Sequence, residues 1–232
     1  MTPRFTRHFN ILCIPSASEV TLTKIFSSIL NGFFNLGFAE NVKRTADIIT
    51  ASTIEVYKRI SLEKLPIPSK FHYTFNLRDV SKVFQGILMV KNATIRDEQQ
   101  ASRLWLHEVS RVFYDRLINE EDRKWFKEMA MDLLGRRFST RQQYEDLFDK
   151  NRVVFSDIMR LEMGKEYEEI KDFKKLIKTL EGKQDDYNYE NASTKMFLVF
   201  FDDCIDHIMR LLRILRQPRG NAMLIGVGGS GK

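Results

Sequence analysis

The sequence contains little cysteine, glycine or proline. Its two cysteines, Cys13 and Cys204, lie in apolar segments far apart in a chain of 232 residues, which excludes a disulfide framework and a CxxC site. The four histidines show no metal-ligand spacing with cysteines or acids, so no metal site is predicted. The 11 glycines and 5 prolines are too few for the turns of a β-sandwich, and the composition therefore favours a mainly helical fold.

Long apolar runs and blocks of one charge are also missing. No apolar run reaches the roughly 18–20 residues that cross a bilayer, and the first residues carry no hydrophobic signal core. We therefore expect no membrane partner and a reducing, cytoplasmic compartment. The net charge of +6 is the balance of 37 basic and 31 acidic residues, and the basic residues form no run of five. An ordinary solvated surface explains this excess better than a nucleic-acid groove, so no nucleic-acid partner is expected.

What the chain does contain is helical periodicity. Hydrophobic residues make up 43% of it, 18 of them phenylalanine, which is enough for a packed core. Apolar residues recur at a spacing of three and four, and this spacing predicts amphipathic helices. The predicted helices cover residues 22–33, 39–60, 77–90, 97–117, 119–133 and 197–215.

The remaining segments are less regular. Residues 166–180 predict a charged helix, residues 152–155 a short strand or loop, and residues 185–191 a polar, turn-like link. Two apolar runs rich in strand formers, Phe9 to Ile14 and Ala222 to Ile225, predict short buried strands. The pair His107 and Glu108 is interpreted as structural, since neighbouring residues of these types usually are.

A glycine-rich motif follows the second apolar run. Gly226-Val-Gly-Gly-Ser-Gly-Lys232 fits the pattern G-x-x-x-x-G-K. Glycines let the backbone approach phosphate oxygens, the exposed N–H groups form an anion nest, and the lysine adds a charge at the β- and γ-phosphates. A chance glycine-rich turn is the alternative, and the preceding apolar run argues against it. The predicted nucleotide-binding residues are Gly226, Gly228, Gly229, Ser230, Gly231 and Lys232.

Longer phrases carry a more specific resemblance. They are Pro3 to Asn10 (PRFTRHFN), Phe71 to Gly86 (FHYTFNLRDVSKVFQG), Leu104 to Leu117 (LWLHEVSRVFYDRL), Glu121 to Phe126 (EDRKWF) and Gln217 to Lys232 (QPRGNAMLIGVGGSGK). Together these segments resemble dynein heavy chains, and their amino-acid sequences are closer to those of ciliary (axonemal) dyneins than to those of cytoplasmic ones. The resemblance covers nearly the whole chain and is weakest over residues 135–193.

The resemblance implies a mainly α fold cut from a ring of AAA+ modules. Residues 1–36 would end the large subdomain of the third module, entering its last core strand. Residues 37–160 would form the helical AAA+ lid of that module. Residues 161–232 would begin the fourth module with a helix, a strand and the phosphate loop (Walker A).

The family also implies a function for the intact protein. By this resemblance the intact protein would be an ATP-driven, minus-end-directed microtubule motor that uses ATP and Mg²⁺. Its partners would be the neighbouring AAA+ modules of the same heavy chain, microtubules, and dynein intermediate and light chains, and its site the cytoskeleton of the ciliary axoneme. Residues 1–232 include neither the acidic Walker B strand nor the Ser/Thr that holds Mg²⁺, so alone they are expected not to hydrolyse ATP.

Two arginines receive roles through the same resemblance. Arg4 lies where AAA+ proteins place an arginine finger, which acts on the γ-phosphate of a neighbouring module; Arg7 is the close alternative, and a surface arginine is the simplest one. Arg78 matches the sensor II arginine of the lid, and its alternative is a helix-face charge or a salt bridge with Asp79.

Two hypotheses of other classes remain open from the sequence alone. The chain could be a non-enzymatic helical interaction module that docks a partner through the helices near 22–33 and 197–215. It could also belong to another family of P-loop NTPases, which would not place a long helical lid before the phosphate loop.

Overall fold

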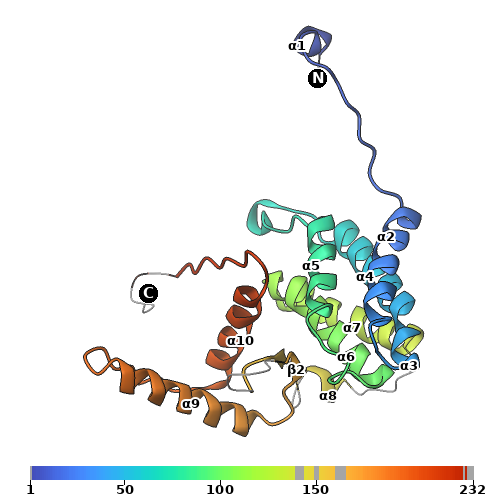
Figure 1. Cartoon of the computed structure of the whole chain (residues 1–232). Coiled ribbons are helices and arrows are strands. Elements are labelled where there is room, and N and C mark those ends of the chain that lie inside the picture. The colour runs from blue at the N-terminus through green and yellow to red at the C-terminus, as the bar shows by residue number, and fades with distance from the viewer. Residues whose placement is uncertain (1, 139–143, 149–151, 160–165, 227, 229–232) are drawn as a thin grey trace.

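The computed structural model describes residues 2–138, 144–148, 152–159, 166–226 and 228. Helices dominate these residues, as the composition predicts, and they form one bundle with a smaller unit packed beside it (Figure 1). The helices and strands are α1 (Pro3–Thr6), α2 (Glu19–Phe34), α3 (Glu40–Lys43), α4 (Thr45–Glu63), η1 (Pro68–Lys70), α5 (Leu77–Ile87), α6 (Glu98–Val112), η2 (Tyr114–Arg116), α7 (Glu120–Arg137), α8 (Glu145–Phe148), β1 (Phe155–Ser156), β2 (Glu168–Glu169), α9 (Phe173–Glu190) and α10 (Asp202–Arg216).

The bundle is built from α2, α4, α5, α6 and α7, and the predicted helical periodicity is confirmed for these five elements. Trp105 on α6 is fully buried, and its indole N–H donates to the Thr53 hydroxyl on α4 at 3.0 Å. Phe26 of α2 stacks on Phe84 of α5 with ring centroids 4.4 Å apart. The apolar stripe of each helix thus faces its neighbours, which is how amphipathic helices gain stability.

A second, smaller core joins the later elements. It contains Val154, Ile170, Leu176, Leu180, Ile205 and Met209. The antiparallel pair β1–β2, in which Phe155 faces Glu169, connects this core to the bundle, and α10 lies beside the bundle while α9 extends away from it (Figure 1). The start of α9 is fixed by Asp172, whose carboxylate accepts from the N–H groups of Lys174 and Lys175 at 2.9 and 3.1 Å.

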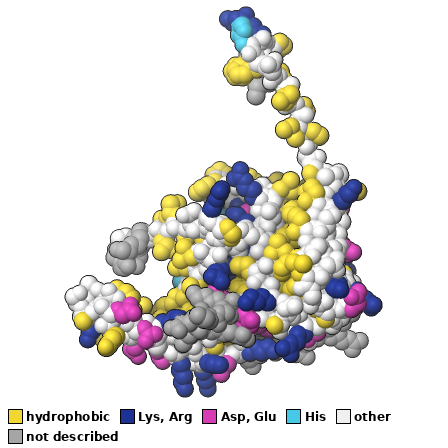
Figure 2. Space-filling model, in the orientation of Figure 1, with side chains coloured by type: hydrophobic (Ala, Val, Ile, Leu, Met, Phe, Trp, Pro, Cys, Tyr) yellow, Lys and Arg dark blue, Asp and Glu magenta, His cyan; other side chains and the backbone are white. Residues whose placement is uncertain are grey.

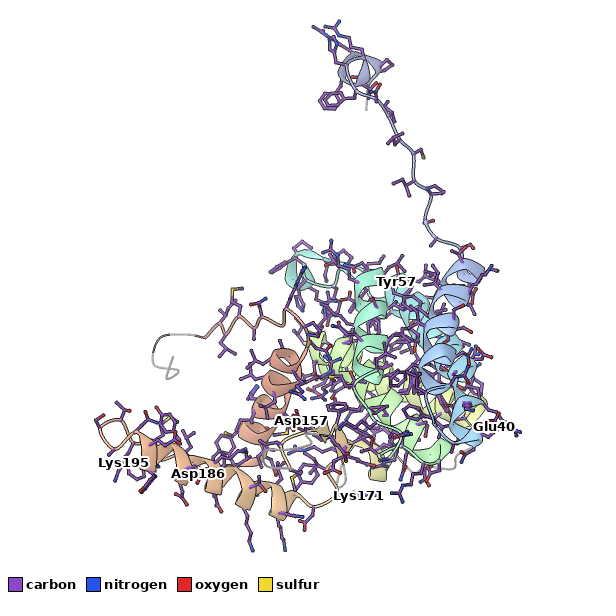
Figure 3. The ribbon with its side chains drawn as sticks, viewed as in Figure 1. Glu40, Tyr57, Asp157, Lys171, Asp186 and Lys195 are labelled. Carbon is purple, nitrogen blue, oxygen red and sulfur yellow. The ribbon has the colours of Figure 1, made fainter. Side chains whose placement is uncertain are left out.

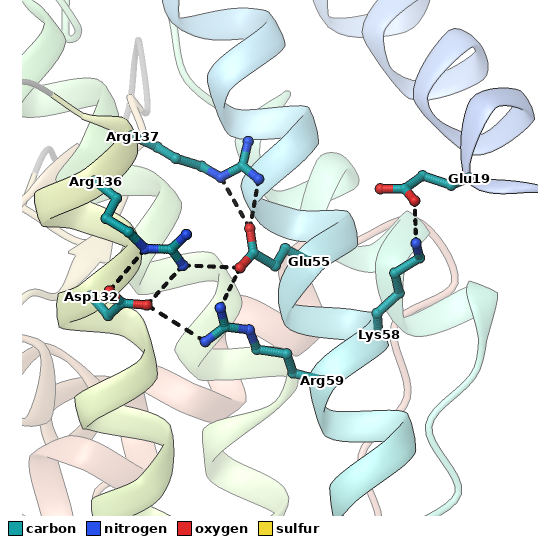
Figure 4. A network of polar contacts seen from close by, with 7 residues as sticks. All are labelled: Glu19, Glu55, Lys58, Arg59, Asp132, Arg136 and Arg137. Carbon is teal, nitrogen blue, oxygen red and sulfur yellow. Dashed lines mark hydrogen bonds and ion pairs between the residues drawn. The ribbon is translucent and has the colours of Figure 1, made fainter.

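Charged side chains bridge the bundle helices on the surface. Glu55 of α4 accepts from Arg136 and Arg137 of α7, at 3.0 and 2.6 Å, and Asp132 joins the same network (Figure 4). Partial burial would raise the pKa of Glu55, but the hydrogen bonds from Arg137 and Arg136 outweigh it and lower that pKa. The network helps to fix α4 against α7, although each exposed pair contributes little by itself.

The two strands expected at the ends of the chain are not formed. Phe9 lies in a bend after α1, and residues 10–14 and 222–225 are extended, but neither segment pairs with a strand among the described residues. Their apolar side chains are exposed, with Leu12 87% and Ile14 88% accessible, and Figure 2 shows hydrophobic side chains along the N-terminal segment. A strand is stable only beside a partner strand, and the described residues contain a single sheet of two two-residue strands.

Helix boundaries in α9 and α10 also differ from expectation. The charged helix expected over residues 166–180 begins only at Phe173, because Glu168 and Glu169 form strand β2 beside β1. The polar pattern of residues 185–191 predicts a link, yet α9 continues through them to Glu190, because their polar side chains lie on solvated helix faces. The apolar pattern of the last helix predicts a start at 197, but the helix begins at Asp202. The residues just before Asp202 are extended. The side-chain amide of Asn188 hydrogen-bonds the backbone of Met196, and that of Gln184 hydrogen-bonds the backbone of Leu198. These bonds satisfy backbone groups that would otherwise need the hydrogen bonds of a helix.

Asp122 anchors the loop between α4 and α5 to the first turn of α7. Its carboxylate accepts from Lys70 at 2.6 Å and from the Tyr73 hydroxyl at 3.0 Å, and it pairs with Lys64 at 3.0 Å. Partial burial would raise the pKa of Asp122, but these hydrogen bonds outweigh it and lower that pKa. The ionised carboxylate is therefore favoured by folding.

We expect Asp122→Asn to cost about 2 kcal/mol at neutral pH, the range for hydrogen bonds to charged groups. Because the folded pKa lies below the unfolded one, this contribution is present above the unfolded value of about 3.9 and is lost as the pH falls toward the folded value. Urea unfolding between about pH 2 and pH 7 should therefore show the two proteins converging in acid. Asp185→Asn, on an exposed position of α9, is the control and should match the parent at every pH.

Candidate functional site

Arg78 lies in the first turn of α5, where the chain enters the helix. Asn76 caps this helix and Asp79 completes a capping box. The salt bridge between Arg78 and Asp79, one of the alternatives, is not formed: Asp79 instead pairs with Arg116 of η2 at 2.9 Å. The Arg78 side chain is exposed and makes no hydrogen bond or ion pair with the described residues, so it is available for a group outside them.

Arg4 lies in the short helix α1, separated from the bundle by the extended segment that follows it (Figure 1). It is exposed. The alternative residue, Arg7, donates from its Nε to the ring of His8 at 2.9 Å. The structure therefore does not bring either arginine close to Arg78.

The phosphate-loop motif lies only partly within the described residues. Gly226 ends the extended segment and Gly228 lies in a turn, whereas Gly229, Ser230, Gly231 and Lys232 lie outside the residues that the structure describes. The segment before Gly226 starts from the end of α10. The contacts that hold α10 thus determine where the segment leading to Gly226 begins.

A buried carboxylate holds α10. Glu108 of α6 is completely buried and its Oε2 accepts from Nε of Arg213, on α10, at 2.9 Å, with a second bond from Nη2 of the same guanidinium. Its other oxygen accepts from the Tyr167 hydroxyl at 2.7 Å. The backbone of α5 passes so close to this carboxylate that a Cβ on Gly86 would lie 1.7 Å from Oε2. Four separate segments therefore meet at one carboxylate.

Burial shifts the pKa of two side chains beside Glu108, those of His107 and Tyr167. Burial, and then the charges of Arg111 and Arg213, lower the pKa of His107 well below its ordinary value, so the imidazole is neutral. Its Nδ1 then donates to the Val153 carbonyl at 3.1 Å. Burial and the Glu108 carboxylate raise the pKa of Tyr167 well above its usual value. Tyr167 therefore stays protonated and donates to Glu108, and its hydroxyl oxygen also lies 3.1 Å from Nε2 of His107.

Weaker ion pairs hold α10 along the same face. Asp157, which lies beside α10 in Figure 3, pairs with Arg216 at 2.9 Å, and Arg152 pairs with Asp206 at 3.1 Å. The outer part of α9, marked by Asp186, and the loop after it, marked by Lys195, lie away from this contact (Figure 3). Charge pairs thus close the interface between α10 and the lid, and in the described part of the chain the Glu108–Arg213 pair is the one whose carboxylate is completely buried.

The sequence interpretation of His107 and Glu108 as structural agrees with this burial. It did not identify Arg213 or Tyr167 as their partners. One signal was present in the sequence: Glu108 lies among Leu104, Trp105 and Val112 on the apolar side of a helix, and a carboxylate there needs a buried partner. Nothing in the sequence indicated which of its 37 basic residues that partner would be.

Among the described residues, no group of three His, Cys, Asp or Glu side chains could hold a metal ion. Within the same residues, no helix combines the length and apolarity needed to cross a membrane.

Two family models match the chain. Residues 48–152 match the AAA+ lid domain, and residues 196–232 match the P-loop containing dynein motor region D4. The first match covers most of the bundle, and the second contains α10 and the phosphate-loop motif. The buried contact between Glu108 and Arg213 therefore joins the segments that the two models describe.

Curated relatives match the chain from end to end. It is 44% identical to human dynein axonemal heavy chain 6, 43% identical to rat dynein axonemal heavy chain 1 and 37% identical to mouse dynein axonemal heavy chain 12, in each case over 100% of this chain. The chain spans only 6%, 5% and 8% of the length of these relatives.

Proposed function

Since the chain belongs to the dynein heavy chain family and matches axonemal heavy chains along its whole length, we propose that it forms the lid of the third AAA+ module and the start of the fourth. In this proposal residues 1–36 end the large subdomain, 37–160 form the lid and 161–232 begin the next module. The match of 48–152 to an AAA+ lid supports the assignment. The packing of α2 against α4 extends the helical core into residues before 37.

The intact protein is proposed to be an ATP-driven, minus-end-directed microtubule motor of the ciliary axoneme. Nucleotide binding follows from the AAA+ family; Mg²⁺ as the companion ion is part of the proposal. Its proposed partners are the neighbouring AAA+ modules, microtubules, and intermediate and light chains. In this proposal residues 1–232 contribute a lid, one phosphate loop and two functional arginines to the intact motor.

Arg78 is proposed as the sensor II arginine and Arg4 as the arginine finger. The exposure of Arg78 at the start of a lid helix, with Asp79 already paired to Arg116, supports the first role, because the guanidinium is free to contact a nucleotide phosphate. Arg4 would act on the nucleotide of an adjacent module, and its exposed position on α1 is compatible with that. A guanidinium suits both tasks because its charge is permanent and its donors form a rigid fork.

The observation that carries the proposal is the buried contact between the lid and the helix that leads to the phosphate loop. Glu108 and Arg213 fix α10 to α6, so a tilt of the lid moves the chain that enters the loop as part of one rigid body. The alternative of a helical docking module is disfavoured by the burial of both helices. Leu22, Phe26, Leu30 and Phe34 of α2 are buried in the bundle, although Ile25 and Ile29 remain exposed, and Ile205 and Met209 of α10 are buried in the second core.

We expect Lys232→Ala to weaken ATP binding about 10- to 100-fold in a protein extended through the whole fourth module. The lysine supplies a charge-assisted contact to the phosphates, a class of contact worth about 1.5–3 kcal/mol. Binding of a fluorescent ATP analogue measures the effect. The matched control is Lys195→Ala, at an exposed position between α9 and α10, which should bind as the parent does. The assignment fails if the extended protein folds but shows no ATP affinity and Lys232→Ala changes nothing.

A further inference from the structure

A polar cleft opens where α10 meets the lid. It has a volume of about 610 Å³ and lies between the first turn of α5, the end of α6 and the turn that follows α10. The Glu108–Arg213 contact forms its inner end, since Arg213 lines it. The cleft is separate from the phosphate-loop residues, none of which lines it among those described.

Positive charge predominates in the cleft. Among the described residues, one carboxylate lines the cleft, that of Asp79. Five cationic side chains line it: Lys82, Arg111, Arg116, Arg213 and Arg219. Glu108 and Asp115, outside the lining, pair with Arg213 and Arg111, and Asp79 pairs with Arg116 at 2.9 Å. Lys82 reaches only the already paired Asp79, at 3.8 Å, and Arg219 has no ion pair with any described residue. Two positive charges therefore remain uncompensated.

Two of the guanidinium groups are held in place by hydrogen bonds and still have N–H donors that these bonds do not use. Arg116 donates to Asp79 and to the carbonyls of His72 and Thr74, at 2.7 and 3.1 Å, through its two terminal nitrogens, which leaves Nε unused. Arg213 is fixed through Nε and Nη2, which leaves Nη1. Donors that are already ordered lose little conformational entropy when an anion binds them.

Arg219 adopts a backbone conformation that costs free energy. Its φ is +59°, the only positive φ of a non-glycine residue in the described part of the chain. It is the third residue of a turn closed by the Gly220 N–H donating to the Gln217 carbonyl at 2.9 Å, with Pro218 second, the pattern of a type II turn in which glycine or asparagine is favoured at this position. Strained residues of this kind persist where the strain serves a site.

The shape and the lining indicate the class of ligand. No aromatic side chain lines the cleft in the described structure, so a nucleobase would find no ring to stack on. Arginine and lysine donors converging on a polar space suit phosphate oxygens. We propose that this cleft binds a small multivalent phosphate anion of the pyrophosphate class, with Arg219 and Lys82 supplying the uncompensated charge and Arg116 and Arg213 supplying fixed donors.

The decisive comparison uses Arg219→Gly and Arg219→Asn, titrated with inorganic pyrophosphate by calorimetry. Both residues adopt positive φ readily, so both variants should keep the fold, and Arg219→Gly should melt at the same temperature as the parent or higher. We expect pyrophosphate affinity to fall about tenfold or more in both, since one charge-assisted contact is removed. Lys183→Gln, on an exposed position of α9, is the charge-matched control and should bind as the parent does.

Lys232→Ala separates the cleft from the phosphate loop. Pyrophosphate binding should survive this change, whereas loss of binding in Lys232→Ala, or unchanged binding in both Arg219 variants, would overturn the proposal. The same titration with ATP, GTP and adenosine distinguishes a free phosphate from a nucleotide as the source of the ligand. Equal affinity for ATP and GTP in Lys232→Ala, with none for adenosine, is the result expected of a cleft that contacts phosphate alone.

Discussion

Glu108→Ala is expected to lower the free energy of unfolding by about 3–5 kcal/mol, the cost of removing one partner from a buried ion pair. The change leaves the Arg213 guanidinium, only 9% exposed, without its carboxylate, and it also removes the acceptor of the Tyr167 hydroxyl. Burial would lower the pKa of Arg213, but Glu108 reverses this and raises it. Urea unfolding at neutral pH measures the loss directly.

A matched acid and a double-mutant cycle identify the cause of that loss. Glu128 is exposed and pairs only loosely with Lys124, at 3.9 Å, so Glu128→Ala should change stability by less than about 0.5 kcal/mol. In Glu108→Leu combined with Arg213→Met, both charges are gone, and much of the stability should return because apolar replacements of a buried pair are often tolerated. Equal costs for Glu108→Ala and Glu128→Ala would show that the contact does not hold α10.

The same pair should also affect the nucleotide. In a protein extended through the fourth module, Glu108→Gln keeps the shape of the side chain but removes its charge, so α10 and the segment leading to Gly226 should become less firmly positioned. We expect weaker ATP binding without global unfolding, checked by the ATP titration alongside far-UV circular dichroism. Unchanged ATP affinity in a folded but destabilised variant would restrict the pair to a structural role.

Gly86→Ala is expected to destabilise the chain by about 1–3 kcal/mol, in the range for overpacking a core. The new Cβ would lie 1.7 Å from Glu108 Oε2 and 3.0 Å from Arg213 Nη2. The carboxylate cannot move aside without losing its bonds to Tyr167 and Arg213. The effect is unusual because alanine is normally the better helix former, by about 0.5–1 kcal/mol.

Two other helical glycines provide controls for Gly86→Ala. At Gly135 of α7 and Gly182 of α9, no described atom outside the adjacent turns of the same helix lies within 4 Å of the position that an added methyl group would take. Alanine at either position should therefore leave stability equal or raise it by about 0.5–1 kcal/mol. In the background Glu108→Leu with Arg213→Met, the penalty of Gly86→Ala should change, because residues in contact are not additive. Destabilisation of similar size at all three glycines would mean that the carboxylate is not the cause.

Local sequence was sufficient to predict the helices of the bundle and the family. The apolar residues of α2, α5, α6 and α7 repeat with the period of a helix, and each of these helices contributes residues of that stripe to the core. The long phrases such as FHYTFNLRDVSKVFQG and QPRGNAMLIGVGGSGK indicated dynein heavy chains, because a motif of many fixed residues rarely occurs by chance. The phosphate-loop motif was recognised in the same way, although most of its residues lie outside the part of the chain that the structure describes.

Packing between distant segments determined the rest. The apolar runs 9–14 and 222–225 have strand composition, but a strand needs a neighbouring strand, and none is present among the described residues. Asp79 pairs with Arg116 rather than with its neighbour Arg78, and Glu108 meets a guanidinium 105 positions along the chain. A local sequence pattern indicates which face of a helix is buried. The cation that pairs with a buried carboxylate on that face is determined by the packed fold, because the pairing depends on the geometry between segments that are remote in sequence.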